Sequence, residues 1–513
     1  MKTTKDDYLI GVDIGTQGTK AAVFDAAGRT RATAFRKSRL LHPAPGAVEE
    51  DPEAQLRSVC AAIKQCVEQA GIDSARVAAV GIDGQMAGVI GIGADGRHVT
   101  PYDSWLDTRC SAEIVRMKRE AGAEIIGKTG GPPSFNHGPK ILWWQRECGE
   151  VYRQIAAFVQ PGGYAAMRLC GLGADEAFID TTYLHFSGFA DSVRRQWDAD
   201  LCKTFGVSPE KLPRIVEPHS IVGRVAARMA ARCGLKSGTP VVAGCGDTAA
   251  SFLACGATRA GVCVDVAGTA SVFAATTSEF RADTVHQVLG WGRSAVPGLW
   301  HPYAYINGGG MNLEWIAGQV FALAKVPPED RLKRLEALAA RIEPRADDPM
   351  FVPHLGGRVS PSWPCLRGCF AGLAWSHTAG HLYRAVLEGV ALEYAIYRDV
   401  LRELIADHAM REVRVTGGGE RSGLWNRIKA DALEIKIVRV SRAEGAPLGA
   451  ALLAGYGAGL LADLDAAARS WIKTEKPVRP VRGTAGHYRA RLARYRQMLD
   501  WAHAWSESSG VDR

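Results

Sequence analysis

The sequence lacks any long apolar run. Its most hydrophobic stretches are interrupted by Asp or Gly well short of the roughly 18 residues that a membrane-spanning helix needs. Lys2, Lys5, Asp6 and Asp7 leave no room for the apolar core of a signal peptide before the first expected strand. Clusters of Lys and Arg are missing too, and a formal net charge of +8 is mild for 513 residues. We therefore expect a cytoplasmic protein that binds neither membranes nor nucleic acid.

Paired cysteines are also missing. The twelve cysteines include no CxxC pair, and the closest two, Cys365 and Cys369, have no matching Cys or His pair nearby. This pattern is typical of reduced thiols in a cytoplasmic protein and does not favour a metal site at the cysteines.

The sequence does have the composition of a globular chain, with 47% hydrophobic and 23% charged residues. Its length suits roughly two to four domains. Expected strands and helices alternate along the chain, which favours an α/β fold. A buried strand is expected at Val77–Gly84, and a strand, a glycine turn and a helix are expected in that order at both Thr239–Ala257 and Val413–Leu433.

The opening stretch, LIGVDIGTQGTKAAVFDAAG (residues 9–28), reads as a hairpin with an unusual turn. Backbone N–H groups and threonine hydroxyls in such a glycine-rich turn can hold phosphate oxygens. The acid on the first strand, Asp13, could hold a magnesium ion that bridges those oxygens. The alternative is an ordinary glycine hairpin, because short glycine motifs are weak signals by themselves.

A second stretch, GVCVDVAGTASVFAATT (residues 261–277), repeats this order of strand, Asp, Gly-Thr turn and strand. Two such units about 250 residues apart suggest two domains built on one plan, although chance similarity of two short hairpins is the alternative. We expect residues 1–257 and 258–513 to form the two domains, with the boundary near Thr258. The two Gly-Thr loops would then face each other across a cleft and clamp a nucleotide.

Asp247 lies in GCGDT (residues 244–248), where an expected strand ends and a helix begins. It could be a plain helix cap, because acids are favoured at helix N-termini. The glycines before it would also let a ligand approach the carboxylate closely. A carboxylate in that place could accept the proton of a hydroxyl that attacks a phosphoryl group.

Taken together, these motifs resemble the FGGY carbohydrate kinases. The resemblance rests on DIGTQGTK, GDTAAS, AGTAS, TGGGERSGLW and GCFAGLAWSHTAGHLYRAVLEG (residues 368–389), which cover nearly the whole chain in the family's order. GQMAG (residues 84–88), SWLDTRC and EGAPLGAALLAG point to the xylulokinase-like branch. The implied fold has two ribonuclease-H-like domains of the actin and hexokinase type, with the active site in the cleft between them.

The resemblance also implies roles for individual residues. The first domain would bind the sugar and carry the base, and the second would bind the nucleotide; the last residues of the chain could pack back on the first domain. ATP and Mg²⁺ are the implied cofactors, and Asp13 is both a catalytic residue and the implied metal ligand. Asp247 is the implied catalytic base and lies against the sugar. The other expected sugar contacts are Gln85, Met86, Asp103, Trp105 and Thr248. The expected nucleotide contacts are Thr16, Gly18, Lys20, Gly268, Thr269, Gly310, Gly418, Gly419 and Ser422.

The chain departs from the family pattern where the sugar is chosen. His137 and Trp144 replace the usual residue types in the N-terminal signature, and Ala87 replaces a histidine that xylulokinases associate with the sugar. The expected activity is transfer of the γ-phosphoryl of ATP to a hydroxyl of a xylulose-like ketopentose or a related polyol. The alternatives are an erythritol-like polyol kinase and a non-kinase ATPase of the actin-like superfamily. The identity of the sugar, any regulation and the oligomeric state, a homodimer included, are left open by the sequence.

Overall fold

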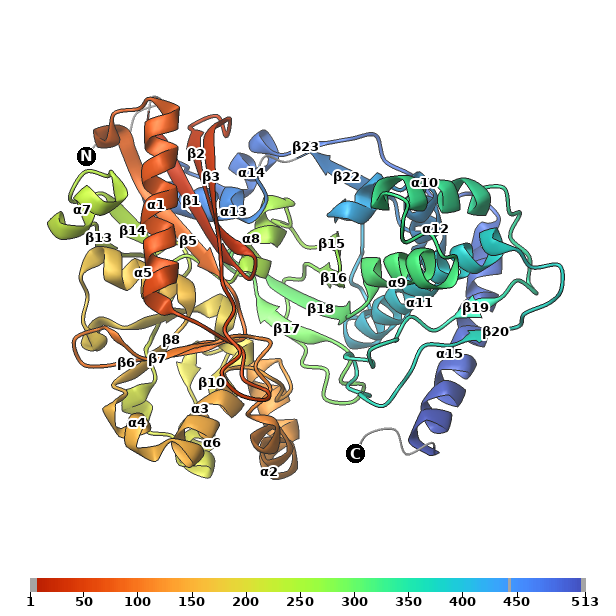
Figure 1. Cartoon of the computed structure of the whole chain (residues 1–513), viewed down its shortest axis with the longest axis horizontal. Coiled ribbons are helices and arrows are strands. Elements are labelled where there is room, and N and C mark those ends of the chain that lie inside the picture. Colours follow the sequence, from red (N-terminus) through yellow and green to blue (C-terminus); the bar gives the residue numbers. More distant parts are fainter. Residues whose placement is uncertain (1–6, 442–443, 509–513) are drawn as a thin grey trace.

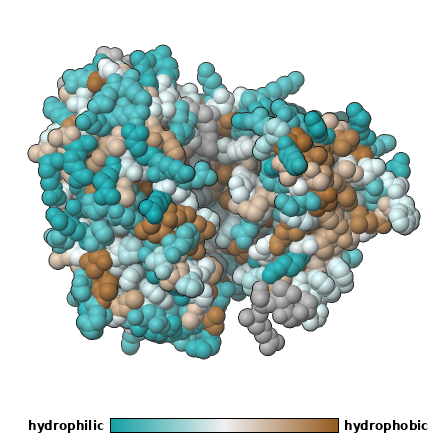
Figure 2. Space-filling model, viewed as in Figure 1, coloured by the Kyte–Doolittle hydropathy of each residue, from teal (hydrophilic) through white to brown (hydrophobic). Residues whose placement is uncertain are grey.

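The computed structural model describes residues 7–441 and 444–508. Two α/β halves lie side by side, the first coloured red to yellow-green and the second green to blue (Figure 1). Each half is built around one mixed sheet. The space-filling view is hollowed between the two halves (Figure 2).

The first sheet begins with an antiparallel meander and continues with parallel strands. Its strands run in the order β13-β14-β5-β1-β2-β3, and β1 pairs parallel with β5, which pairs parallel with β14. Strands β1 and β5 are apolar and buried on both faces, as expected for the centre of a sheet covered by helices. The bounds are β1 (Tyr8–Gly15), β2 (Gly18–Asp25), β3 (Thr30–Lys37), β5 (Val77–Gly84), β13 (Ile221–Arg224) and β14 (Pro240–Val242).

Helices cover this sheet, and a smaller sheet extends it. Helix α1 (Pro52–Ala70) begins where Asp51 accepts the Glu53 N–H and ends at Gly71, whose positive φ of 61° suits glycine. A four-stranded sheet in the order β4-β7-β6-β8 lies beyond the first sheet. The elements of this part are β4 (Glu49–Glu50), β6 (Val89–Ile92), β7 (His98–Asp103), β8 (Ala157–Val159), α2 (Ser111–Thr129), α3 (His137–Glu147), α4 (Gly149–Gln154), α5 (Pro161–Cys170), α6 (Ala199–Phe205) and α7 (Ala227–Cys233).

The second sheet repeats the plan of the first. Strands β18-β16-β15 form an antiparallel meander, and β15 continues in parallel to β21 and β22, just as β3-β2-β1 continue to β5 and β14. The two-domain, ribonuclease-H-like fold that the sequence predicts is therefore confirmed. The strands are β15 (Val262–Ala267), β16 (Ser271–Ala275), β17 (Gly290–Arg293), β18 (Trp300–Ile306), β21 (Glu412–Thr416), β22 (Ile437–Ser441) and β23 (Lys473–Thr474), with β19 (Met350–Phe351) and β20 (Phe370–Ala371) paired apart from it.

Long helices complete the core of the second half. Helix α11 (Ala379–Leu404) buries Val386, Val390 and Tyr394 against this sheet and its neighbours, so this side of the helix is a packing face. The neighbouring helices are α9 (Gly309–Trp315), α10 (Pro328–Ala339), α12 (Gly423–Leu433) and α15 (Thr484–Ser508).

One helix returns to the first half late in the chain. Helix α13 (Ala446–Gly457) packs on β1 and β5 and on α8 (Asp247–Ala254). A Cβ on Gly11 would lie 1.8 Å from the Pro447 carbonyl oxygen, so only glycine allows this approach. After α14 (Leu464–Trp471), the final helix α15 instead packs on α11 and α12. The returning segment is thus internal and not the end of the chain, and the boundary near Thr258 stays a prediction.

None of the helices within residues 7–441 and 444–508 is both long and apolar enough to span a membrane.

Candidate active site

Three aspartates meet where the parallel strands of the first sheet end. Asp13, near the end of β1, pairs in register with Asp83 of β5. Gly84, the next residue, forms a parallel bridge with Gly246, which directly precedes Asp247. The ends of β1, β5 and the segment after β14 therefore bring three carboxylates to one edge of the sheet.

Two glycines allow this close approach. Gly244 has a φ of +76°, and a Cβ on it would lie 1.7 Å from the Ile82 carbonyl oxygen. A Cβ on Gly246 would lie 2.7 Å from the Cε of Met86. Met86, an expected sugar contact, therefore lies against the residue that precedes Asp247, the expected base.

Asp247 lies at the start of helix α8 without being its N-cap residue. It is the first residue of α8, and the N-cap position belongs to Gly246. Its Oδ1 accepts the Thr248 N–H at 2.5 Å and the Thr248 hydroxyl at 3.1 Å, and no other donor reaches the carboxylate within the described residues. Burial, reinforced by the negative charge of Asp13, raises the pKa of Asp247 to about 7. A carboxylate that titrates near neutral pH is well suited to general-base catalysis.

Asp83 lies beside Asp13, and the sequence reasoning did not single it out. Its side chain is fully buried, and neither carboxylate oxygen has a hydrogen-bond donor; Asp13 Oδ1 has none either. Burial, and then the charges of Asp13 and Asp247, raise the pKa of Asp83 well above its usual range. The available signal was the repeated pattern Gly-Val-Asp13 and Gly-Ile-Asp83 on what prove to be neighbouring strands.

These donor-free oxygens fit a divalent cation. Three buried carboxylate oxygens without a donor are costly unless a proton or a cation neutralises them. In the described ranges, no three His, Cys, Asp or Glu side chains are arranged to hold a metal alone. That suits Mg²⁺, which is usually held by one or two carboxylates and completes its shell with water and substrate phosphates.

A short helical turn, η3 (Thr181–Phe186), braces the same strand ends and was also missed. The Thr182 hydroxyl accepts the N–H of Gly246 at 3.0 Å. The Tyr183 hydroxyl donates to the Gly84 carbonyl oxygen at 3.0 Å. Farther along the turn, the His185 ring bonds the hydroxyl of Tyr303 in the second half at 3.0 Å. The turn therefore connects the backbone beside Asp247 to the other half of the molecule.

The expected phosphate turn and the expected sugar pocket are linked by hydrogen bonds. The indole N–H of Trp105, a half-exposed side chain, donates to the Thr16 hydroxyl at 2.9 Å. Thr16 lies 3.4 Å from the Gln85 side-chain oxygen, and the Gln85 amide donates to Glu50 at 2.7 Å. Thr16, Gln85 and Trp105 are thus brought together as one group.

Two other residues of the first hairpin have local partners. A Cβ on Gly18 would lie 2.3 Å from the Arg36 carbonyl oxygen, so close strand packing already accounts for this glycine. Lys20 forms an ion pair with Glu444 at 2.7 Å while staying partly exposed. The ammonium of Lys20 is therefore held at the turn, directly across the hairpin from Asp13.

The glycine-rich loops of the second half also come together. The N–H of Gly310 donates to the Gly268 carbonyl oxygen at 2.9 Å, and Met311 makes the same contact with Thr269 at 3.1 Å. A Cβ on Gly419 would lie 2.8 Å from Ala267 Cβ, whereas one on Gly418 would meet nothing within 4 Å. The three expected nucleotide loops therefore share one edge of the second sheet, and Gly418 has open space in front of it.

The hydroxyl of Ser422, an expected nucleotide contact, is hydrogen-bonded within the protein. Its hydroxyl accepts the Trp425 N–H at 3.0 Å, which caps helix α12, and it donates to Glu336 at 2.9 Å. Both bonds are internal to the protein. The hydroxyl proton is therefore already donated, and a nucleotide could meet Ser422 only by donating to the remaining lone pair of its oxygen.

The second hairpin does not repeat the orphaned carboxylate of the first. Asp265, the counterpart of Asp13, accepts hydrogen bonds from the Lys429 ammonium at 2.5 Å and from the Tyr394 hydroxyl at 2.8 Å. All three side chains are buried. Asp265 is therefore neutralised inside the core, and the pseudo-symmetric halves use the same acid for different purposes.

Both departures from the family's N-terminal signature contact expected sugar residues. The His137 ring N–H bonds the Met86 carbonyl oxygen at 2.5 Å. The Trp144 indole N–H donates to Asp103, whose other oxygen pairs with Arg109 at 2.9 Å. Asp103 is thus buried with both oxygens engaged, and it can shape the pocket wall more readily than it can bind a hydroxyl directly. Arg109 also pairs with Asp107 at 2.8 Å, in agreement with a structural ion pair.

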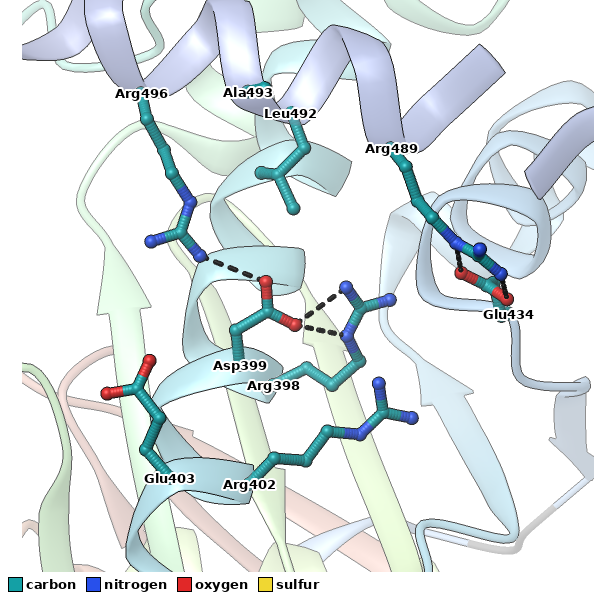
Figure 3. Close-up of a pocket in the computed structure, with 9 residues that line it drawn as sticks. All are labelled: Arg398, Asp399, Arg402, Glu403, Glu434, Arg489, Leu492, Ala493 and Arg496. Atoms are coloured by element: carbon teal, nitrogen blue, oxygen red, sulfur yellow. Dashed lines mark hydrogen bonds and ion pairs between the residues drawn. The ribbon is translucent and has the colours of Figure 1, made fainter. Parts of the chain in front are cut away.

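A surface cavity of about 610 Å³ lies between α11 and α15 and contains none of the predicted site residues. Its charged side chains largely pair with one another, as Figure 3 shows: Asp399 lies between Arg398 and Arg496, and Arg489 pairs with Glu434 at 2.8 Å. Most of the charges that line the cavity are therefore neutralised within it.

Comparison with known proteins agrees with the geometry. Residues 8–254 match the N-terminal domain and residues 263–458 the C-terminal domain of the FGGY family of carbohydrate kinases. The xylulose kinase of Escherichia coli (strain K12) is 30% identical over 455 residues, which cover 87% of this chain and 89% of that protein. The gluconokinase of Bacillus subtilis (strain 168) is 26% identical, covering 94% of this chain and 93% of that protein.

A solved structure gives the same result. The crystal structure of xylulose kinase from Rhodospirillum rubrum superposes with a TM-score of 0.90 at 29% identity and covers 98% of this chain and 100% of that one. The chain therefore belongs to the FGGY family of carbohydrate kinases.

Proposed function

We propose that this kinase transfers the γ-phosphoryl of ATP to a hydroxyl of a xylulose-like ketopentose or a related polyol. The observation that carries the proposal is the position of Asp247. It follows Gly246, which lies against Met86, and it stands at the same strand ends as Asp13. A sugar over Met86 would present a hydroxyl to Asp247, and phosphates at the first hairpin would lie beside Asp13. Membership of the carbohydrate kinases argues against a non-kinase actin-like ATPase.

In this mechanism the protein mainly positions the reactants. Asp247 accepts the proton of the attacking hydroxyl, and Thr248 and η3 fix its orientation. Thr16 and Lys20 from the first hairpin, together with Gly268, Thr269, Gly310 and Gly418 from the second half, hold the nucleotide phosphates. Mg²⁺, when bound at Asp13, would neutralise charge on the phosphoryl oxygens. Closure of the two halves would keep water away from the phosphoryl group.

The direct test is a screen of ketoses and polyols with ATP and coupled detection of ADP. We expect sugar-dependent ADP formation with a ketopentose or an alditol of similar size. Since the relatives include both a xylulose kinase and a gluconokinase, gluconate belongs in the panel. ADP formation that no sugar, acid or alditol stimulates would contradict the proposal.

Ala87 should set the choice of sugar. Histidine can bond a sugar hydroxyl through a ring nitrogen, whereas alanine can neither donate nor accept. We therefore expect D-xylulose to be a mediocre substrate, with a related sugar or alditol preferred. Ala87→His should raise kcat/KM for D-xylulose relative to the preferred compound by roughly 5- to 150-fold, the equivalent of about 1–3 kcal/mol for one hydrogen bond.

The matched control is Ala27→His, in the exposed turn between β2 and β3. It should leave kcat/KM for D-xylulose relative to the preferred compound unchanged. A wild-type enzyme that prefers D-xylulose tenfold or more over every other compound would refute this interpretation of Ala87. His137, whose second ring nitrogen is buried without a partner, would then be the residue to examine.

A further inference from the structure

We infer that Asp83 is a second carboxylate ligand of the divalent cation, beside Asp13. The inference rests on the proposed function, which brings the cation to the site with the nucleotide. The two acids lie on adjacent parallel strands in direct register, so their side chains leave the sheet on the same face. The site would thus take Mg²⁺ between two neighbouring strands of the first half.

The strongest observation is that the buried carboxylate of Asp83 has no hydrogen-bond donor. Other buried acids have donors: Asp265 has Lys429 and Tyr394, Glu393 has Arg358 and Tyr495, and Asp283 caps three backbone N–H groups. Among all side chains in residues 7–441 and 444–508, Asp83 is the only acid with both oxygens buried and without a donor. An uncompensated charge in the interior is costly, so Asp83 either keeps a proton or meets a cation that binds from outside.

The surroundings favour a cation as that partner. Asp13 adds another donor-free oxygen, and Asp247 adds a third acid at the same strand ends. Lys20, the nearby cation, is already paired with Glu444. Two carboxylates without a third protein ligand match the way Mg²⁺ binds between protein and phosphates.

A simpler alternative is that Asp83 keeps a proton and only hydrogen-bonds to Asp13. Asparagine separates the two possibilities, because its amide can replace a protonated carboxyl as a donor but adds no negative charge. Asp83→Asn would therefore preserve a purely hydrogen-bonding role and remove a cation ligand.

The experiment measures Mn²⁺ binding by electron paramagnetic resonance, with a non-hydrolysable ATP analogue present and no sugar. We expect Asp83→Asn to weaken Mn²⁺ binding by at least roughly 10-fold, the lower end of the cost of changes around metal sites. Asp95→Asn, which removes one exposed acid from the same half, is the matched control and should bind Mn²⁺ like wild type. Equal affinity in wild type and Asp83→Asn would overturn the inference.

Thermal melting shows whether the variant is folded and gives a second measure of metal binding. Wild type should gain melting temperature with Mg²⁺ and the nucleotide analogue, because a ligand that binds only the folded state stabilises it. Asp83→Asn should melt normally without Mg²⁺ and lose most of that gain; a variant that keeps the full gain would count against Asp83. A wild type that binds neither metal nor nucleotide would instead refute the proposed cofactors, so the two failures can be told apart.

Discussion

Asp247→Asn should lower kcat by roughly 10²–10⁴, the usual contribution of a general base. Asparagine keeps the shape of the side chain and can still accept from Thr248, so the start of α8 should be preserved. Sugar and nucleotide binding, measured by calorimetry, should stay close to wild type because neither depends on proton transfer. A variant that turns over at a near-normal rate would place the base elsewhere.

The pH dependence gives a second view of the same residue. With a pKa of about 7, Asp247 loses its proton as the pH rises through 7 and can then act as a base. The kcat/KM of the wild type should therefore fall with decreasing pH below about 7, and this dependence should vanish from the residual activity of Asp247→Asn. Asp73→Asn, an exposed acid that caps a short turn, is the matched control and should keep both rate and pH profile.

Lys429→Met should destabilise the second half by about 3–5 kcal/mol, because it leaves Asp265 charged and buried with only a tyrosine hydroxyl as donor. Both members of the pair are fully buried, and burial lowers the pKa of Lys429 although Asp265 opposes the change. Thermal or urea unfolding monitored by tryptophan fluorescence measures the loss, since Trp425 lies against the ammonium at 3.7 Å.

Two further variants isolate the charge effect. Asp265→Asn combined with Lys429→Met removes both charges and should recover a large part of the lost stability. Lys436→Met removes a partly exposed ammonium that pairs with Glu412, and it should cost less than about 1 kcal/mol. If Lys429→Met were no more harmful than Lys436→Met, the buried pair would not be a structural requirement.

Expected hairpins, glycine turns and apolar strands are local signals, and they were enough to predict an α/β fold with two similar units; the ribonuclease-H-like architecture was implied by the resemblance to a family. The same local signals pointed to Asp13, Asp247 and the glycine loops as candidates, because each lies in or beside a glycine turn. The position of Asp83 beside Asp13 could not be predicted, because it depends on the pairing of two strands that are 70 residues apart in the chain. The role of Lys429 depends on an acid 164 residues away, and nothing in either segment alone points to the other.

The repeat itself was visible, but the difference between its copies was not. Asp13 and Asp265 occupy equivalent places in the two hairpins, and only the three-dimensional neighbours reveal that one is neutralised while the other is not. The role of η3 could not be predicted either, because hydrogen bonds between its side chains and distant backbone atoms leave no pattern in the sequence.

The return of α13 to the first sheet has a consequence for how the protein is made. One face of β1 and β5 remains bare on the ribosome until residues 446–457 have been synthesised, long after the rest of the first half has emerged. At roughly 5–20 residues per second, the nascent chain exposes this apolar surface for tens of seconds. The first half to be translated is thus completed only after most of the second half has been synthesised.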